Sequence, residues 1–297
     1  MKAGGIHAGE TAAAAMIAER TNDGRFGSPG LPTGTMPGQW RPVLPMFVND
    51  PSGWIRNVTP FLIQDASQFR THGPFPLTSR RYAADFAEVK AIGSATSTTR
   101  TADQTSAARY WAENPPATWT RIARMLSLRA GLSVADNARY FAMLYLTQAD
   151  ALISVWDDKA RWSFWRPITA IREAATDGNA KTEADPEWLP LIPTPPYSEH
   201  PSGHLGLSAS TVRTLQQFFG TDAIGWSDTN SAGLTRSYKS LSGALEEIVS
   251  VRVWSGIHFR HADEQGARIG KKVANWRQRH FFQRVQLAAG DDAELND

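Results

Sequence analysis

The 297-residue sequence contains no cysteine. This absence excludes disulfides, zinc–thiolate sites, iron–sulfur clusters and thiol nucleophiles, and it leaves the redox compartment open. No stretch reaches the roughly 18 apolar residues that suggest a membrane span. Glu10 and Glu19 interrupt the alanine-rich start of the chain, so we expect no signal peptide there. Secretion and a cytoplasmic location both stay open.

An excess of charge of one sign is also lacking. Lysine and arginine number 31 against 29 acidic residues, which gives a formal net charge of +2. Because no basic tract occurs, we do not expect nucleic acid as a partner. Hydrophobic residues make up 41% and charged residues 20%, proportions that are ordinary for a globular protein and exclude bulk disorder.

Strand-like alternation of apolar and polar residues is lacking too, and the predicted fold is an all-α helical bundle. Apolar residues recur in steps of three and four, the period of a buried helix face, and Ser133 is a predicted N-cap. Further helices are expected over 205–219, with a stop at Gly220, from 241 onward, with Ser240 near the start, and over 266–282. The clearest stripe comprises Val134, Ala138, Phe141, Tyr145, Ala149, Leu152 and Trp156.

Proline is concentrated in one region of the chain. Nine of the 18 prolines lie between Pro29 and Pro76, which predicts an irregular strap over a helical body. We expect a single domain that lacks N-terminal helices, because the chain begins in mid-helix. Its predicted segments are the end of a packed helix (1–24), an extended strap with apolar anchors such as Phe47 (25–78), a catalytic helical core (79–285) and a polar tail (286–297).

Cations continue two of the apolar stripes. The first stripe extends through Lys159 to Arg166, and the helix is expected to break there because Pro167 follows. The helix that begins near residue 241 carries Arg252 on its buried stripe. Buried cations are costly unless something negative meets them. Either a bound anion lies among these cations, or buried carboxylates pair with them, for which Asp150, Asp157, Glu246 and Glu247 are available.

Two further segments favour an anion. In Pro201-Ser202-Gly203-His204, Ser202 precedes a predicted helix whose N-terminal N–H groups could bind an oxyanion, although an ordinary capped helix has the same pattern. His258 follows Arg252 by six residues, and Gly256 between them indicates a helix break. Histidine can attack phosphorus or coordinate a metal at neutral pH, although a lone histidine among apolar residues is more often structural.

Taken together, these segments resemble the three-part signature of the superfamily of type 2 phosphatidic acid phosphatases and vanadium haloperoxidases. The signature is Lys159 and Arg166-Pro167, then Pro201-Ser202-Gly203-His204, then Arg252 and His258. The residues around these motifs, and the strap, are similar to the soluble bacterial haloperoxidase-like branch. The resemblance implies a helical bundle of the haloperoxidase and acid phosphatase type with an irregular Pro/Gly-rich N-terminal arm.

The resemblance also implies a set of residues around vanadate or phosphate, which we call the anion cage. In it, Lys159, Arg166 and Arg252 would hold the oxygens, and Lys159 would also polarise a bound peroxide. Ser202 and the Gly203 N–H would donate further hydrogen bonds. His258 would be the apical vanadium ligand, or the phosphorylated nucleophile of a phosphatase, and His204 the acid–base residue.

The function implied by the resemblance is that of a vanadium-dependent haloperoxidase. Such an enzyme uses hydrogen peroxide to oxidise a halide to hypohalous acid, which halogenates a small organic acceptor. The main alternative is a soluble acid phosphatase that acts on phosphomonoesters through a phospho-histidine. A second alternative is a non-catalytic helical anion-binding domain. A homo-oligomer is compatible with each of them.

Two features of the site stay open at this stage. Some members of the superfamily carry an acidic residue four positions after the ligand histidine, as its hydrogen-bond partner. Here that position is Ala262, with Asp263 one residue later, so the partner of His258 is undetermined. The residues beside His204 would tune the choice of halide, for which Tyr197, His200 and Trp165 are candidates.

Overall fold

The computed structural model describes residues 2–283 and confirms the all-α prediction. The polar tail expected over 286–297 lies outside the described residues. Three short 3-10 turns are η1 (Gly53–Asn57), η2 (Ala66–Phe69) and η3 (Ala174–Thr176). The helices are α1 (Lys2–Glu19), α2 (Arg80–Ile92), α3 (Ala102–Tyr110), α4 (Pro115–Arg129), α5 (Val134–Trp162), α6 (Pro167–Arg172), α7 (Gly203–Phe219), α8 (Leu241–Trp254) and α9 (Arg260–His280).

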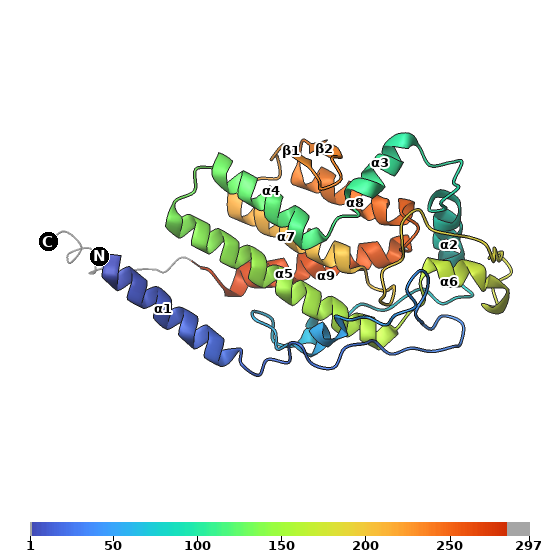
Figure 1. Cartoon of the computed structure of the whole chain (residues 1–297), viewed down its shortest axis with the longest axis horizontal. Helices are drawn as coiled ribbons and strands as arrows, with labels where there is room; N and C mark the ends of the chain where they lie inside the picture. The colour runs from blue at the N-terminus through green and yellow to red at the C-terminus, as the bar shows by residue number, and fades with distance from the viewer. Residues whose placement is uncertain (1, 284–297) are drawn as a thin grey trace.

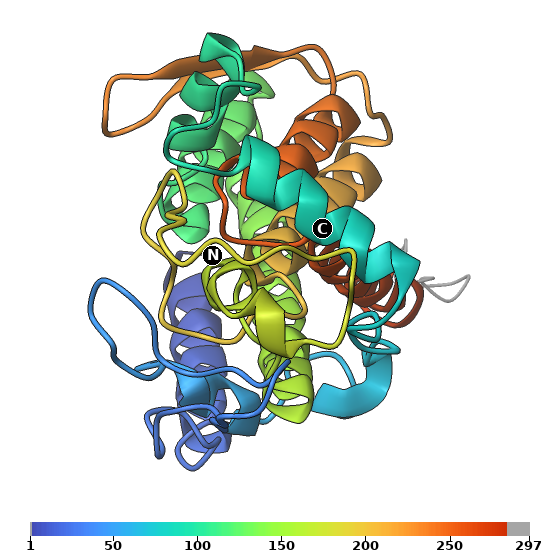
Figure 2. The same cartoon turned by 90° about the vertical axis from the view of Figure 1, so that its right-hand side faces the viewer.

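Helices α5, α7 and α9 run side by side and form the centre of the bundle (Figures 1 and 2). Helix α7 is buried on nearly every side over its first three turns, and the predicted stop at Gly220 is confirmed by a left-handed φ of 70°. Helices α4 and α8 pack against α7, while α2 and α6 pack against each other at the right of Figure 1. The central helices therefore bring together segments that are far apart in the sequence.

The long helix α5 begins where the sequence predicts and ends slightly earlier. Ser133 accepts a hydrogen bond from the Asp136 N–H and so caps the helix. The helix ends at Trp162 because Ser163 is left-handed (φ 39°), and α6 starts at Pro167 with Arg166 in the N-cap position. The expected break near Arg166 is confirmed.

The prediction of which face of α5 is buried was wrong, because most of the buried positions lie about one residue away from the predicted ones. Val134 and Tyr145 from the predicted stripe are 89% and 41% exposed. Two apolar stripes run next to each other along α5, and the positions of α7, α9 and the strap decide which of them is covered. The buried stripe consists of Tyr140, Leu144, Thr147, Ala151 and Val155.

A short β-hairpin contradicts the expectation that no strands occur. Its strands β1 (Trp226–Thr229) and β2 (Thr235–Tyr238) pair antiparallel, with Trp226 opposite Tyr238. Each strand has only four residues, and their exposed positions carry serine and threonine. Such short segments give too little alternation to be distinguished from a polar loop.

The strap over 25–78 is ordered and anchored on α5, as expected. The buried carboxylate of Asp150 accepts the backbone N–H groups of Phe61, Leu62 and Ile63 at 2.6–2.9 Å. Trp156 Nε1 donates to Asp50 of the strap at 2.7 Å. The prediction that Phe47 anchors the strap was wrong, because its side chain is 63% exposed.

Helix α1 differs from its expected packing. It ends at Glu19, close to the predicted stop, but none of its residues is buried. It projects from the bundle at the lower left of Figure 1. The helix is therefore present, while the packing expected for it does not occur against residues 20–283. None of the described helices combines the length and the apolar character needed to cross a lipid bilayer.

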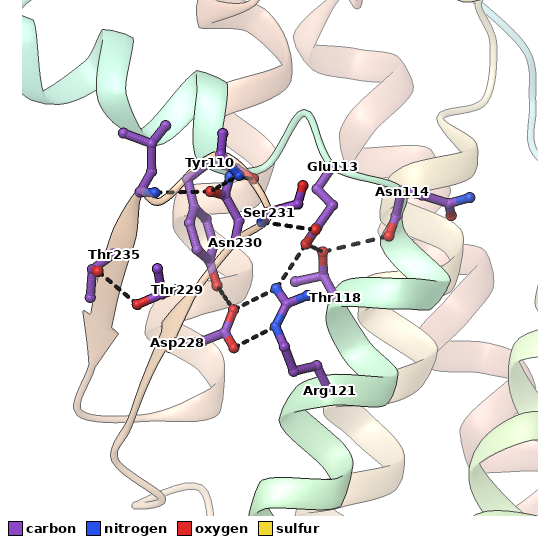
Figure 3. A network of polar contacts seen from close by, with 12 residues as sticks. Tyr110, Glu113, Asn114, Thr118, Arg121, Asp228, Thr229, Asn230, Ser231 and Thr235 are labelled. Atoms are coloured by element: carbon purple, nitrogen blue, oxygen red, sulfur yellow. Dashed lines mark hydrogen bonds and ion pairs between the residues drawn. The ribbon is translucent and has the colours of Figure 1, made fainter.

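A charge network fastens the hairpin to α3 and α4 (Figure 3). Arg121 of α4 makes two 2.7 Å hydrogen bonds to Asp228 of β1 and one of 2.8 Å to Glu113. Tyr110 also donates to Asp228, at 2.7 Å. Burial alone would raise the pKa of Glu113, but hydrogen bonds from Arg121, Thr118 and Ser231 lower it to about 2.

We predict that Arg121→Ala destabilises the fold by about 2 kcal/mol at neutral pH, a value reduced for the partial exposure of Arg121. Because the pKa of Glu113 is depressed from its ordinary 4.5, its stabilising contribution is present above pH 4.5 and is lost as the pH falls towards 2. The difference between wild type and variant should therefore shrink at pH 3. Urea unfolding at both pH values measures it, with the exposed Arg124→Ala of the same helix as control.

Candidate active site

The three predicted cations all lie in the interior, held by backbone carbonyls. Lys159 is 0% exposed, and its Nζ donates to the carbonyls of Ser198 and Glu199 at 2.6 and 3.1 Å. Arg166 is 0% exposed and donates from Nε to the Tyr197 carbonyl at 2.7 Å. Arg252 is 5% exposed, and its Nη1 lies 3.4 Å from the Trp111 carbonyl. Carbonyl oxygens orient these cations without neutralising them.

The carboxylates that were expected as alternative partners lie elsewhere. Asp150 binds the strap, Asp157 pairs with Arg70, and Glu247 pairs with Arg236. Glu246 is exposed. None of the four pairs with a cage cation within residues 2–283, so the interpretation of the cations as ordinary buried ion pairs is wrong.

His258 lies in the break between α8 and α9. Gly256 has a φ of 78°, a conformation that favours glycine, and the turn brings His258 to Arg166. His258 Nε2 is 3.2 Å from Arg166 Nη1, and Nδ1 is 3.1 Å from Glu199 Oε1. Burial lowers the pKa of His258 well below its ordinary value, and the neighbouring cations lower it further. The ring is therefore neutral at neutral pH.

Ser202, Gly203 and His204 form the start of α7. Ser202 occupies the predicted N-cap position, but its hydroxyl makes no capping hydrogen bond. A Cβ on Gly203 would come within 2.9 Å of the Trp156 ring, which explains why glycine is required there. Burial, followed by the charge of Arg252, lowers the pKa of His204 well below its ordinary value.

Four buried polar atoms of these residues have no hydrogen-bond partner: Arg166 Nη2, Arg252 Nε, Ser202 Oγ and His204 Nε2. Buried polar atoms are almost always paired in proteins, by protein groups, water or a ligand, so this group can bind a polar ligand. The two guanidinium atoms can only donate, which suits the oxygens of an anion. No group of three or more His, Asp or Glu residues within 2–283 could hold a metal cation. The residues present therefore fit an oxyanion such as vanadate or phosphate.

The cage also shows why its ligand should be negative. Burial lowers the pKa of Lys159 well below its ordinary value, and the charge of Arg166 lowers it further. Burial lowers the pKa of Arg166 and of Arg252 as well. A bound anion would offset this repulsion and favour the charged form of each side chain.

Two residues at the site were missed from the sequence. Glu199 binds His258, and Trp111 lies beside His204 with ring centroids 6.3 Å apart. Both come from segments that are remote from their partners along the chain, and no local pattern marks them. Trp111 is also fixed at its indole nitrogen, which donates to Tyr238 at 2.8 Å.

The three candidates for tuning the halide lie in different surroundings. The Tyr197 ring lies 5.0 Å from Lys159 Nζ and 4.7 Å from Arg166 Cζ, so it packs against the cage. His200 Nε2 lies 2.9 Å from the hydroxyl of Thr71 in the strap. Trp165 is fully buried in the core that α2 and α6 share.

Comparisons with known proteins agree with this geometry. Residues 139–286 match a family model described as the VCPO second helical-bundle domain. Vanadium chloroperoxidase of Curvularia inaequalis is 28% identical over 158 residues, which cover 44% of this chain and 25% of that protein. This chain thus spans about a quarter of the length of its curated relative.

Two solved structures share the fold. A bacterial vanadium-dependent iodoperoxidase is 27% identical, with a TM-score of 0.74 over 86% of this chain and 63% of its own. An apo-type bacterial vanadium-dependent chloroperoxidase is 17% identical, with a TM-score of 0.72 over 92% of this chain and 73% of its own, and shows the fold alone. Residues 139–286 thus belong to the VCPO second helical-bundle family, and the curated relative and the solved structures that this chain resembles are vanadium haloperoxidases.

Proposed function

We propose that this protein is a vanadium-dependent haloperoxidase that uses hydrogen peroxide to oxidise a halide to hypohalous acid. The observation that carries the proposal is the set of four unpartnered buried atoms around His258, which belong to Arg166, Arg252, Ser202 and His204. Their donors suit an oxyanion, and their burial excludes water from it. The relatives of the chain support vanadate as that oxyanion.

In this proposal the three cations neutralise the negative charge of the ligand. Backbone carbonyls hold Lys159, Arg166 and Arg252 in position, and a bound anion would favour the charged form of each. The Ser202 hydroxyl and the free N–H groups at the start of α7 would donate further hydrogen bonds. The low-dielectric surroundings strengthen each of these interactions relative to water.

The two histidines would have different roles. His258 presents Nε2 to the cage in a neutral ring, so its lone pair is available to bond the central atom. When bound, vanadate would supply Lewis-acid activation of hydrogen peroxide. The net reaction of peroxide, halide and a proton to give hypohalous acid and water needs a group that moves protons. His204, neutral and unpartnered at Nε2, can accept and return one.

Paired assays on one preparation test the proposed function. We expect peroxide-dependent halogenation of a phenol dye after vanadate loading, with chloride, bromide and iodide compared. Hydrolysis of a nitrophenyl phosphate without vanadate, in the absence of halogenation, would contradict the proposal and favour the phosphatase. Vanadate binding with neither activity would contradict it in favour of a non-catalytic anion-binding domain.

We predict that Arg252→Ala weakens vanadate binding about 10- to 150-fold, because a charge-assisted hydrogen bond contributes about 1.5–3 kcal/mol. Titration calorimetry with vanadate measures the change. Arg100→Ala is a matched control, because Arg100 is also a partly buried arginine bound to backbone carbonyls, those of Ile92 and Ser94. The control should keep the wild-type affinity, and equal losses in both variants would assign the effect to stability.

A further inference from the structure

The side chain of Glu199 ends at the imidazole of His258, deep in the protein. Its Oε1 lies 3.1 Å from His258 Nδ1, and both residues are 1% exposed. We propose that Glu199 is the positioning residue that fixes the tautomer and ring orientation of His258, in place of an acidic residue four positions later. The consequence for vanadate affinity rests on the proposed function, whereas the tautomer itself does not.

Arg166, which lies on the other side of the His258 ring, also indicates the tautomer of that ring. A guanidinium has five N–H donors and no acceptor, so Arg166 Nη1, at 3.2 Å, can only donate to His258 Nε2. Nε2 must therefore carry a lone pair. In a neutral ring the proton then resides on Nδ1, which faces Glu199 and donates to it.

The geometry at Glu199 agrees with that assignment. Its Oε1 also accepts the backbone N–H of Phe259 at 2.9 Å, a group that can only donate. One oxygen therefore receives two donors, from His258 and from the next residue along the chain. This pair of bonds fixes both the ring and the backbone beside it, so the imidazole has little freedom to rotate.

Glu199 is itself held by its backbone. Its N–H donates to the Phe164 carbonyl at 2.9 Å, and its carbonyl accepts from Lys159 Nζ at 3.1 Å. The same residue thus links the cation of α5 to the histidine after α8. Such partners of a metal-ligating histidine typically change metal affinity or activity 10- to 100-fold when they are mutated.

The acidic residue that follows His258 most closely in the sequence does not accept a hydrogen bond from it. Asp263, at the start of α9, is fully buried, and neither carboxylate oxygen has a hydrogen-bond partner among the described residues. The position four residues after His258 is Ala262, which has no polar side chain. The acceptor for His258 therefore comes from a segment 59 residues earlier in the chain.

Two substitutions separate hydrogen bonding at Glu199 from its charge. Both bonds are accepted by one oxygen, so Glu199→Gln can keep them through its amide oxygen, whereas Glu199→Leu removes both. We expect Glu199→Leu to weaken vanadate binding about 10- to 100-fold. Glu199→Gln should stay within about threefold of wild type, which corresponds to less than about 0.7 kcal/mol. Asp150→Asn is the matched control, at an equally buried carboxylate that accepts backbone N–H groups of the strap.

The direct readout is nitrogen-15 NMR of the imidazole rings in the vanadate-free protein, with His258 assigned by its loss in His258→Ala. Wild type, Glu199→Gln and Asp150→Asn should show a proton on Nδ1 with the chemical shift of a hydrogen-bonded N–H, and Glu199→Leu should lose that shift or show a mixture of tautomers. Vanadate titration calorimetry on the same variants gives the affinities.

Either of two results would overturn the proposal: a wild-type His258 protonated at Nε2, or a Glu199→Leu variant in which both the tautomer and the chemical shift of the Nδ1 proton are unchanged. The first needs no variant to fold. If wild type fails to bind vanadate, the proposed function fails, while the tautomer measurement still decides the role of Glu199.

Discussion

Replacing His258 with alanine is expected to lower turnover by more than about 10³-fold, for halogenation and for phosphomonoester hydrolysis alike. The guanidinium groups around the site can only donate hydrogen bonds, while His258 Nε2 presents a lone pair to the cage. The loss of His258 removes the proposed bond from Nε2 to the central atom of the ligand. No other cage residue can form that bond with the same geometry.

The stability of His258→Ala should change far less than its activity. His258 lies between two helices, and Glu199 would still accept the Phe259 N–H. Dye halogenation and urea unfolding on the same sample measure both effects. His72→Ala, at an exposed histidine of the strap, serves as control and should keep wild-type turnover. Substantial turnover by a folded His258→Ala protein would exclude His258 as ligand or nucleophile.

For His204→Ala we expect a turnover loss of about 10²- to 10⁴-fold at saturating vanadate, the usual contribution of an acid–base residue. Burial and the charge of Arg252 keep this histidine neutral, so it can accept a proton near neutral pH. Vanadate affinity should fall only several-fold, roughly 1 kcal/mol, because the three cations remain.

A titration of halogenation rate against vanadate distinguishes proton transfer from mere binding by His204. Wild type and variant should both saturate, with the variant at a much lower plateau. A variant plateau close to that of wild type would show that His204 only contacts the anion. Proton transfer would then belong to another group, and His200 and His261 would be the next residues to replace.

Local signals in the sequence predicted where the helices that carry the cage residues begin and end. Ser133, Ser240 and Gly220 mark helix ends through their own capping chemistry, and Pro167 marks a restart. Such signals act over a few residues and survive in the fold. The apolar stripes that ran into cations likewise pointed to an interior anion.

Long-range packing could not be predicted in the same way. Glu199 and His258 are 59 residues apart, and Trp111 and His204 come from different helical segments. The covered face of α5 depends on where α7, α9 and the strap lie, because two adjacent stripes are both apolar enough to be buried. The packing of α1 and the hairpin were wrong for related reasons: neither feature has a strong periodic pattern of its own.

The most direct test of the account is a crystal structure of the protein soaked with vanadate. We predict vanadium bonded to His258 Nε2, with its oxygens contacted by Lys159, Arg166 and Arg252 and by the Ser202 hydroxyl. Vanadate bound elsewhere, or bonded to another residue while His258 keeps its contacts with Glu199 and Arg166, would contradict the anion cage.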